Sequence, residues 1–522
     1  MVVQFNRDVC RSDPTTGPPT TGRSFFFVDT QDDVSQEFGV GREKMAFLSK
    51  LAHQRRKKES VARLRADQRT RSQRTAATQE GFTHALTRQG RSTDLTGYLG
   101  QGYVDPFDTS SVVMTDSMNM YFHHFRAYIA PTAIPFDGAR EGTMWAQKSA
   151  ALPALRYIGL FLAAENMTVL ESTPRIAPST SSSSAQHAIQ YRIKAIAYLN
   201  QLLQQPATAR AESTIFCVST VKHCEALNAQ FTALQAHKHG LRTLINLAGG
   251  LEKLGHTLVA TIYQGDIATA ALNDSQPCFP MLPNFRAGVL NEAEMFSHGN
   301  RDYDYGVPIP LSASAFGTRF TNSPWYVELD TEIRTVLHAC RRLFVHFEMG
   351  ISLPSCVKPT DKDLYIILLH HLLALRYSPS DIDMNEPLRR TLFIYTYMRI
   401  WNFGSFPVTH YIAKGLKESI MPRLSYLETS APDLLLWILF IGSLASQGYE
   451  SHSWFVRTLR DVAIKLDVTE WGSVRSILAE FFYSDRSGYR RGEDLWTEVM
   501  APSRMCIAPR GSQSTSQMTS TG

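Results

Sequence analysis

The sequence predicts an all-α fold, and three observations support this prediction. From residue 115 onward, apolar residues recur at spacings of three and four, which is the period of a helix packed on one face. Alternating polar and apolar runs, the pattern of half-buried strands, are nearly absent. The chain has 522 residues, of which 43% are hydrophobic and 19% charged, so it can bury a large core. We therefore expect one multi-helix domain over 103–502.

The two ends of the chain are too polar to join this core. Residues 1–40 are rich in Pro, Thr and Gly and contain only a short apolar island, FFFV, at residues 25–28. Residues 41–92 form a basic segment that we expect to be partly helical. Segments with so little apolar surface cannot offset the entropy lost on ordering. We expect a disordered N-terminus over 1–40, a basic arm over 41–92 and a disordered tail over 503–522.

The first expected helices precede a serine-rich loop. DSMNMYFHHFRAYI begins at residue 116, and the helical pattern continues in MWAQKSAALPALRYIGLFLAAENM over 144–167. The flexible loop lies near 171–185. The next helix, AQHAIQYRIKAIAYLNQLL, is stopped by Pro206. Its apolar residues follow a helical spacing and form one predicted stripe: Ile189, Ile193, Ile196, Leu199 and Leu203.

The same period continues to the end of the domain. Further helices are expected near 210–235, 237–248, 256–272, 327–348, 361–377, 387–402, 433–446, 451–466, 471–483 and 493–500. The doublet Gly249-Gly250 follows a helical stretch, so it is interpreted as a helix C-cap and turn. Residues 273–326 contain six prolines and form a second long loop, which is a lid, a packed connector or a mobile insertion. Trp437, Leu251 and Trp454 are expected to be packing positions.

No motif of an enzyme is present. The chain has no G-x-x-x-x-G-K-[ST] phosphate loop, no G-x-S-x-G nucleophile turn and no H-E-x-x-H zinc helix. Gly39-Val40-Gly41 and Gly100-Gln101-Gly102 lack the third glycine of a dinucleotide turn. We therefore predict no catalytic residues, no cofactor and no enzymatic activity.

Several groups of possible metal ligands lack the spacing of a site. His123-His124 and His370-His371 are adjacent pairs, whose side chains point in different directions on a helix. Asp302 and Asp304 are interpreted as a solvated turn. No C-x2-C spacing accompanies the mixed donors, so no metal site is predicted. These donors are Cys217, His223, Cys224, His237 and His239.

The cysteines and the apolar segments of the chain indicate in which cellular compartment the protein is expected. The seven cysteines are scattered and odd in number, which fits reduced thiols in the cytosol or nucleus. The start of the chain has no apolar segment typical of a secretion signal. The longest apolar run, Leu434–Leu444, is too short to span a bilayer, which requires roughly 18 residues.

Positive charge is concentrated in the basic arm. Residues 50–74 contain ten Lys or Arg against two acidic residues, a local net charge of +8 in a chain whose total is +5. Such a segment is typical of a nuclear-import signal or of an arm that contacts phosphates; a solubilising segment is the alternative. The residues expected to carry import or phosphate contact are Arg55, Arg56, Lys57, Lys58, Arg63 and Arg65.

Several segments resemble the fungal-specific transcription-factor domain. HKHGLRTLINLAGGLEKLG (His237–Gly255), followed by a helix with Asp266, is similar to a histidine, helix and Gly-Gly-Leu turn of that family. GYVDPF (Gly102–Phe107) resembles its Asp-Pro-Phe entry. AQHAIQYRIKAIAYLNQLL and EPLRRTLFIY resemble two of its helices, as do DLLLWILFIGSLASQG, SWFVRTLRDVAIKL and EWGSVRSILAEFFYSD near the C-terminus.

The resemblance implies a nuclear regulator of transcription. Its helical domain would act through contacts with the transcription machinery, with other regulators or with a small effector, as a monomer, homodimer or heterodimer. The binuclear zinc cluster typical of such regulators is missing, because only Cys10 precedes Cys217, so DNA contact would fall to the basic arm. The alternatives are a cytoplasmic interaction scaffold and an enzyme with a helical cavity covered by residues 273–326.

Overall fold

The computed structural model describes the helical part of the chain and two short strands. The described residues are 2–5, 24–27, 112–130, 136, 138–171, 183–289, 308–358, 360–401, 403–484 and 492–501. The chain divides into two compact units, Met1–Gly100 and Gln101–Gly522. The predictions made for the basic arm and for the C-terminal tail lie outside the described residues.

The first unit contains a two-stranded antiparallel pair. β1 (Val2–Phe5) pairs with β2 (Ser24–Phe27), with Val2 opposite Phe27 and Phe5 opposite Ser24. The sequence analysis noted the apolar island at 25–28 but predicted no regular structure here. Valine and phenylalanine favour strands, and this pairing joins two apolar stretches that lie far apart in the sequence.

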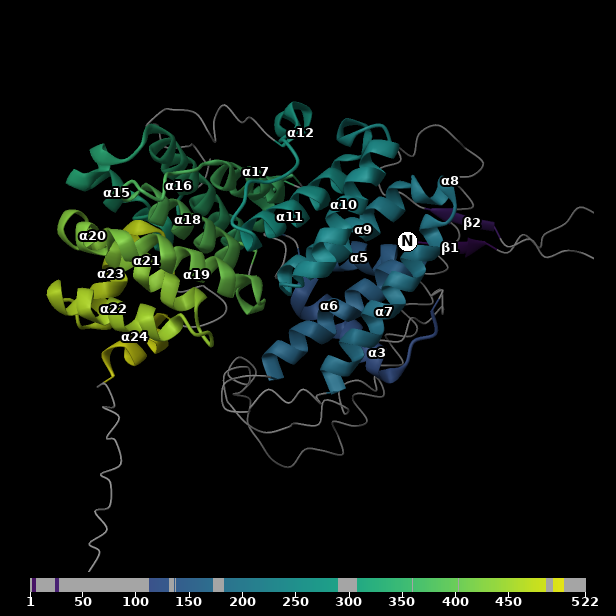
Figure 1. The fold of residues 1–522 in the computed structure, drawn as a ribbon, viewed down its shortest axis with the longest axis horizontal. Coiled ribbons are helices and arrows are strands. Elements are labelled where there is room, and N and C mark those ends of the chain that lie inside the picture. Colours follow the sequence, from purple (N-terminus) through teal and green to yellow (C-terminus); the bar gives the residue numbers. More distant parts are fainter. Residues whose placement is uncertain are drawn as a thin grey trace, which may run out of the picture. The chain divides into compact units, whose positions relative to one another are not determined.

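The second unit consists of helices, which confirms the predicted all-α class (Figure 1). Its N-terminal part contains α3 (Asp116–His124), the π-helix η1 (Phe125–Ile129), α5 (Gly138–Ala151), α6 (Pro153–Glu171), α7 (Ser183–Leu203), α8 (Pro206–Ala209), α9 (Glu212–Leu227), α10 (Phe231–Leu247), the 3-10 helix η2 (Leu251–Lys253) and α11 (His256–Leu272). α11 matches its predicted range at both ends.

The C-terminal part continues the helical pattern through short connections. It contains α12 (Pro283–Gly288), α14 (Leu311–Ser314), α15 (Thr318–Asn322), η3 (Pro324–Glu328), α16 (Thr331–Ser352), η4 (Pro354–Cys356), α17 (Asp361–Ala374), α18 (Asn385–Arg399), η5 (Phe403–Ser405), α19 (Val408–Ile420), η6 (Met421–Arg423), α20 (Leu424–Ser430), α21 (Pro432–Ala445), α22 (His452–Lys465), α23 (Trp471–Phe481) and α24 (Gly492–Met500). The sequence analysis missed α19 and α20.

The helical pattern over 144–167 is divided in the structure between two helices, α5 and α6. The break lies at Leu152, and Pro153 opens α6. Proline has no backbone N–H to donate within a helix, but it fits the first helical position, where that N–H has no partner in any case.

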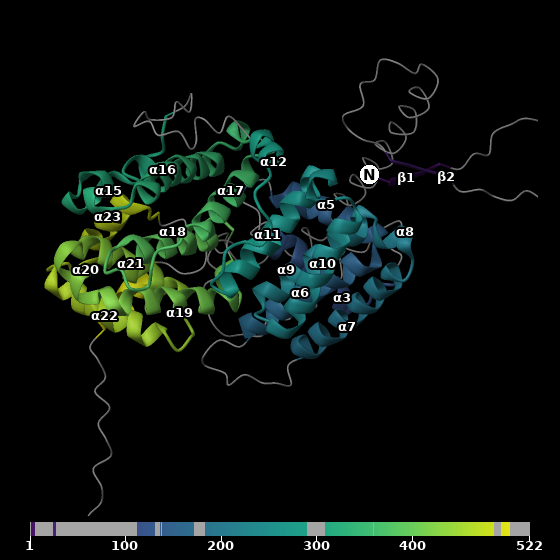
Figure 2. The same cartoon turned by 45° about the horizontal axis from the view of Figure 1, so that its top comes forward.

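The centre of the helical unit lies along α11. This helix packs against α9 and α17 and lies between them in both views (Figures 1 and 2). Gly265 permits a close approach to α9, because a Cβ atom there would lie 3.4 Å from both His223 Cβ and the backbone oxygen of Ser219. Twelve of the 17 residues of α11 are buried, so no single apolar stripe marks it.

The stripe predicted on α7 packs only in part, because Leu199 is buried whereas Ile189 and Ile193 are not. Ile189 and Ile193 are 60% and 63% exposed, while the helix buries a neighbouring face. The buried residues of α7 are Ser184, Ala188, Tyr191, Ala195 and Leu199. Small alanines allow α6 and α7 to approach closely, and Tyr191 fills the space between them, with its ring 6.3 Å from that of Tyr157.

The orientation of α7, with Leu199 buried and Ile193 exposed, predicts unequal losses of stability for two substitutions. Leu199→Ala should lower the free energy of unfolding by about 2–4 kcal/mol, because it opens a cavity in the core. Ile193→Ala, the matched control, should change it by less than about 0.5 kcal/mol, because the side chain is mostly in water. Urea unfolding of both variants measures the difference. If the two variants lost the same unfolding free energy, the described orientation of α7 would be wrong.

The doublet Gly249-Gly250 forms the predicted helix end. Both residues have positive φ angles, 94° and 104°, and the N–H of Gly250 donates to the carbonyl of Ile245 at 3.0 Å. This bond reaches back into the last turn of α10. Glycine is favoured at such positions because it has no Cβ to clash in the left-handed region. The interpretation as a cap and turn is confirmed.

The proline-rich segment 273–326 is not structureless where it is described. Residues 273–289 contain α12, and residues 308–326 contain α14, α15 and the start of η3. Phe320 and Trp325 are buried, with their rings 6.2 Å apart. The described portions therefore pack on the core as connectors. Residues 290–307, which include Asp302 and Asp304, lie outside the described residues.

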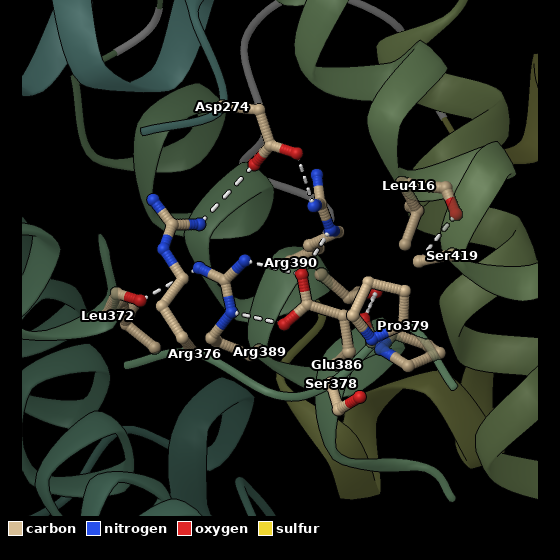
Figure 3. A network of polar contacts seen from close by, with 12 residues as sticks. Asp274, Leu372, Arg376, Ser378, Pro379, Glu386, Arg389, Arg390, Leu416 and Ser419 are labelled. Carbon is tan, nitrogen blue, oxygen red and sulfur yellow. Dashed lines mark hydrogen bonds and ion pairs between the residues drawn. The ribbon is translucent and has the colours of Figure 1, made fainter. Parts of the chain in front are cut away.

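A network of charges, buried at Glu386 and Arg389 and exposed at Asp274, joins α11, α17 and α18 (Figure 3). Glu386 accepts from Arg389 Nε and Nη2 at 2.7 Å each and from Arg390 Nε at 2.6 Å. Arg390 Nη2 also donates to Asp274, 116 positions earlier, at 2.7 Å. Arg389 Nη1 donates to the carbonyl of Leu372 at 2.8 Å. The network therefore fixes the end of α11 and the end of α17 against the first turns of α18.

Among the described residues, no helix has both the length and the apolar character that a membrane crossing requires.

Candidate functional site

The residues predicted to carry import or phosphate contact are not placed by the structure. Arg55, Arg56, Lys57, Lys58, Arg63 and Arg65 all lie outside the described residues. A candidate site within the helical unit must therefore be found from its cavities and its buried polar groups.

A cavity of about 860 Å3 lies where α5, α9, α11, the end of α16, η4 and α17 meet. We call it the α5–α17 cavity. Its size falls within the range of small-molecule sites, about 300–1,000 Å3. The lining residues that matter below are aromatic (Phe136, Trp145, Phe216), neutral polar (Thr220, His223, His256, Thr257, Thr261, Gln264) and charged (Arg140, Glu141, Lys358, Lys362, Asp363).

Aromatic side chains form one wall of the cavity. The rings of Trp145 and Phe216 lie 5.6 Å apart, and Trp145 also contacts Phe125 at 5.5 Å. Phe136 packs on Phe347, with 5.7 Å between the ring centroids. These contacts hold each ring in place from behind, so the wall is preformed for a flat apolar group.

Asp363 is a buried carboxylate at the start of α17. Its Oδ2 is 2.8 Å from Nε2 of His256, and the His256 ring stacks on Phe285 with 4.6 Å between centroids. The residue is only 2% exposed, and Oδ1 has no hydrogen-bond partner among the described residues. A buried acceptor without a partner costs about 1–3 kcal/mol, so a donor from a bound molecule would stabilise this group.

His223 contributes a second buried polar atom to the cavity. Burial, and then the nearby charge of Lys222, lower the pKa of His223 from 6.5 to about 3, so the ring is neutral near pH 7. Its Nε2 is buried and has no hydrogen-bond partner among the described residues. The ring packs edge-on against Phe403 at 5.6 Å. Neutral histidine can donate or accept a hydrogen bond, depending on its tautomer.

Charged groups gather at one side of the cavity. Lys362 Nζ pairs with Glu141 Oε1, and Lys148 Nζ lies 4.5 Å from the centroid of the Phe216 ring. Burial lowers the pKa of Lys148 from its ordinary value, an effect that Glu141 opposes. Arg140 and Lys358 are exposed and line the same cavity. Cationic groups therefore outnumber carboxylates on this side.

The lowered pKa of His223 predicts that the stability of the folded chain depends on pH. Because its folded pKa lies below the unfolded value of about 6.5, protonation favours the unfolded chain, and this group's contribution is lost as the pH falls from about 6.5 toward about 3. The unfolding free energy of the parent protein should fall between pH 7 and pH 5. In His223→Gln the slope of this fall should be smaller by about 1 kcal/mol per pH unit. Urea unfolding at several pH values measures this slope.

The exposed His239 provides the control for that experiment. His239→Gln should leave the pH dependence parallel to that of the parent protein. If the profile of His223→Gln is also parallel to it, the described environment of the ring is wrong.

The adjacent histidine pairs make separate contacts. Nε2 of His124 lies 2.9 Å from the side-chain oxygen of Asn166, and Nε2 of His370 lies 2.9 Å from the carbonyl oxygen of Phe279. His237 lies 3.3 Å from Glu225. Within the described ranges, no three His, Cys, Asp or Glu side chains form a group that could hold a metal ion.

Burial keeps the thiols of Cys217 and Cys224 protonated. Burial raises the pKa of Cys217 to about 12, and burial also raises the pKa of Cys224 above its ordinary value. A thiol must lose its proton to act as a nucleophile or a metal ligand. These two side chains therefore act as apolar core groups at neutral pH.

Sequence reasoning considered His223 only as a metal ligand and did not single out Asp363. The sequence offers one signal for Asp363, an acidic residue in the first turn of a predicted helix. Such residues are common because they offset the partial positive charge of the helix N-terminus, so this signal does not point to a ligand site. The cavity itself depends on segments that are distant in sequence, since α5 and α17 are more than 200 residues apart.

Comparisons with known proteins identify no relative. No family model, no curated protein and no solved structure gives a match to this chain.

Proposed function

We propose that this chain is a nuclear regulator of transcription whose helical domain responds to a small effector bound in the α5–α17 cavity. The observation that carries the proposal is this cavity, whose lining residues include Asp363 and His223, each with a buried polar atom that has no partner among the described residues. The same chain has a segment with a local net charge of +8, suited to nuclear import or phosphate contact. The sequence resemblance described above supplies the role in transcription.

The cavity suits an effector because several helices meet around it. α5, α9, α11 and α17 all contribute lining residues. A ligand that binds their assembled arrangement stabilises it by RT ln(1 + [L]/Kd), which is about 2.7 kcal/mol at a hundred times Kd. That gain shifts the population toward the assembled state, and partners that read the outer helix surfaces would respond. The partners we propose are the transcription machinery or other regulators.

The enzyme alternative has less support from this cavity. It required a helical cavity covered by residues 273–326, yet none of the described residues of that segment, 273–289 and 308–326, lines the α5–α17 cavity. The cytoplasmic scaffold differs from our proposal only in location and in promoter contact. It is addressed by the deletion below and by the crosslinking experiment in the Discussion.

Deleting residues 50–74 is expected to move the protein from the nucleus to the cytoplasm, because the segment contains ten of the cationic residues that import receptors bind. Fluorescence microscopy of tagged full-length and deleted chains measures this. Deletion of residues 75–92, which contain only two arginines, is the control and should leave the protein nuclear. A fully nuclear 50–74 deletion would remove the import role of Arg55, Arg56, Lys57 and Lys58.

A reporter assay tests the regulatory role of the cavity. The full chain is fused to an unrelated DNA-binding domain and placed upstream of a reporter gene. We expect the fusion to change reporter output, and we expect Thr261→Trp, which fills the cavity, to alter that change. A fusion that leaves the reporter unchanged under all growth conditions would contradict the proposed function.

A further inference from the structure

We infer that the α5–α17 cavity binds a small amphipathic organic anion, with a flat apolar body, one anionic group and one hydrogen-bond donor. The inference rests on the proposed use of this cavity as a ligand site, and it adds the chemical class of the ligand. Three features of the lining support it: the exposed cations, the aromatic wall, and the unpartnered buried acceptor of Asp363.

Helix N-termini line the cavity from three sides. Gly138 and Arg140 belong to the first turn of α5, His256 and Thr257 to that of α11, and Thr360 precedes α17. A helix N-terminus carries a partial positive charge and presents backbone N–H donors. These ends add backbone donors to the lining, and the sign of the ligand charge is set by the side chains around them.

Each of these helix ends already has a protein carboxylate beside it. Acidic residues lie in the first turns of α5 and α17, and the N–H of Gly255, which precedes α11, donates to Glu212 Oε1 at 2.9 Å. The exposed cations Arg140 and Lys358 also line the cavity. The anionic group of the ligand is therefore placed beside Arg140 and Lys358.

The charges of the lining side chains favour an anionic ligand. Among the described lining residues, the cations are Arg140, Lys358 and Lys362, and the carboxylates are Glu141 and Asp363. Glu141 is already paired with Lys362, and Asp363 with His256. The carboxylates are thus engaged within the protein, and the exposed Lys358 is available at the rim. This balance favours an anion over a cationic ligand.

The remaining lining defines the rest of the ligand. Phe136, Trp145 and Phe216 offer ring faces and edges to an apolar body. Asp363 Oδ1 is a buried acceptor without a partner among the described residues, so it would take a hydroxyl or N–H from the ligand. The volume of about 860 Å3 accommodates a molecule of two fused or linked rings.

Two dyes with the same ring system test the class of ligand. Anilinonaphthalene sulfonate has a flat aromatic body, one N–H and one anionic group, and phenylnaphthylamine has the same rings and N–H without the charge. Both gain fluorescence in an apolar site. For the purified full chain we expect the sulfonate to bind about tenfold more tightly than the amine, the effect of one favourable charge interaction.

Four variants locate the binding. Thr261→Trp and Gln264→Trp each place a large side chain in the cavity from α11, and each should weaken sulfonate binding about tenfold or more. The double variant Arg140→Gln, Lys358→Gln should remove most of the preference for the sulfonate. The matched control Arg210→Gln, Lys253→Gln removes two exposed cations that do not line the cavity and should keep the preference. Circular dichroism checks that each variant remains helical.

The outcomes separate this inference from the proposed function. Equal binding of both dyes, weakened by the two tryptophan variants, would overturn the anionic class but leave the cavity as a ligand site. Dye binding that neither tryptophan variant weakens would overturn the site itself, and with it the effector role. A preference for the sulfonate that depends on the cavity would support the inference even if the protein never reaches a promoter.

Discussion

Replacement of Glu386 by glutamine is expected to lower the free energy of unfolding by about 3–5 kcal/mol. Its carboxylate accepts from Arg389 Nε and Nη2 and from Arg390 Nε, and the side chain of Arg389 is only 2% exposed. Glutamine retains the size but removes the charge. Arg389 would then remain buried without a countercharge, and this is the main cost. Urea unfolding of the purified chain measures the loss.

Glu418→Gln is the matched control for this prediction. Glu418 is 63% exposed and lies 3.9 Å from Lys414, so its removal should change the unfolding free energy by less than about 0.5 kcal/mol. If the two variants lose the same stability, the network of Figure 3 does not hold α17 and α18 as described.

The same network predicts how the effect depends on pH. Burial alone would raise the pKa of Glu386, but the hydrogen bonds and charges of Arg389 and Arg390 outweigh it and hold the pKa below its ordinary value. A lowered carboxyl pKa stabilises the folded state above the unfolded pKa, about 4.3, and this contribution is lost as the pH falls through the lower folded value. The difference between Glu386→Gln and the parent should therefore shrink below about pH 4.

Truncation of Trp437 is the second large expected effect. Trp437→Ala should cost about 3–5 kcal/mol, because the side chain is fully buried in α21 and stacks on Phe481 with 5.5 Å between ring centroids. Phe320 contacts it from a third helix, edge-on, at 5.7 Å. Thermal unfolding monitored by circular dichroism measures the loss.

Two further substitutions check the origin of that effect. Trp437→Phe should cost less than the alanine variant, because it keeps most of the ring contacts and removes an indole N–H that has no partner among the described residues. Trp454→Ala should cost about 1 kcal/mol, since Trp454 is only partly buried. Equal losses for Trp437→Ala and Trp454→Ala would show that Trp437 is not at the centre of the core.

Most of the helices could be predicted from the sequence, because they depend on local spacing and on breakers. α11 matches its predicted range, and Gly249-Gly250 ends α10 as expected. The packed face of α7 could not be predicted in this way. Apolar spacing favours Ile189 and Ile193, but the close approach of α6 selects the smaller Ala188 and Ala195 instead. Tertiary packing outweighs the hydrophobicity of the stripe.

The candidate site was much less accessible to sequence reasoning than the helices were. His256 and Asp363 are 107 positions apart, and Asp274 and Arg390 are 116 apart. Without related sequences, nothing in local composition pairs such distant residues. The basic arm shows the reverse case, since its charge is plain in the sequence while its residues lie outside the described part of the structure.

Chromatin crosslinking with the full chain tests the central claim most directly. If the protein regulates transcription, we expect enrichment at a defined set of promoters, and we expect Thr261→Trp, with its filled cavity, to change gene output at those promoters while the chain remains nuclear. Absence of promoter enrichment under every growth condition examined would contradict the account and favour a cytoplasmic scaffold.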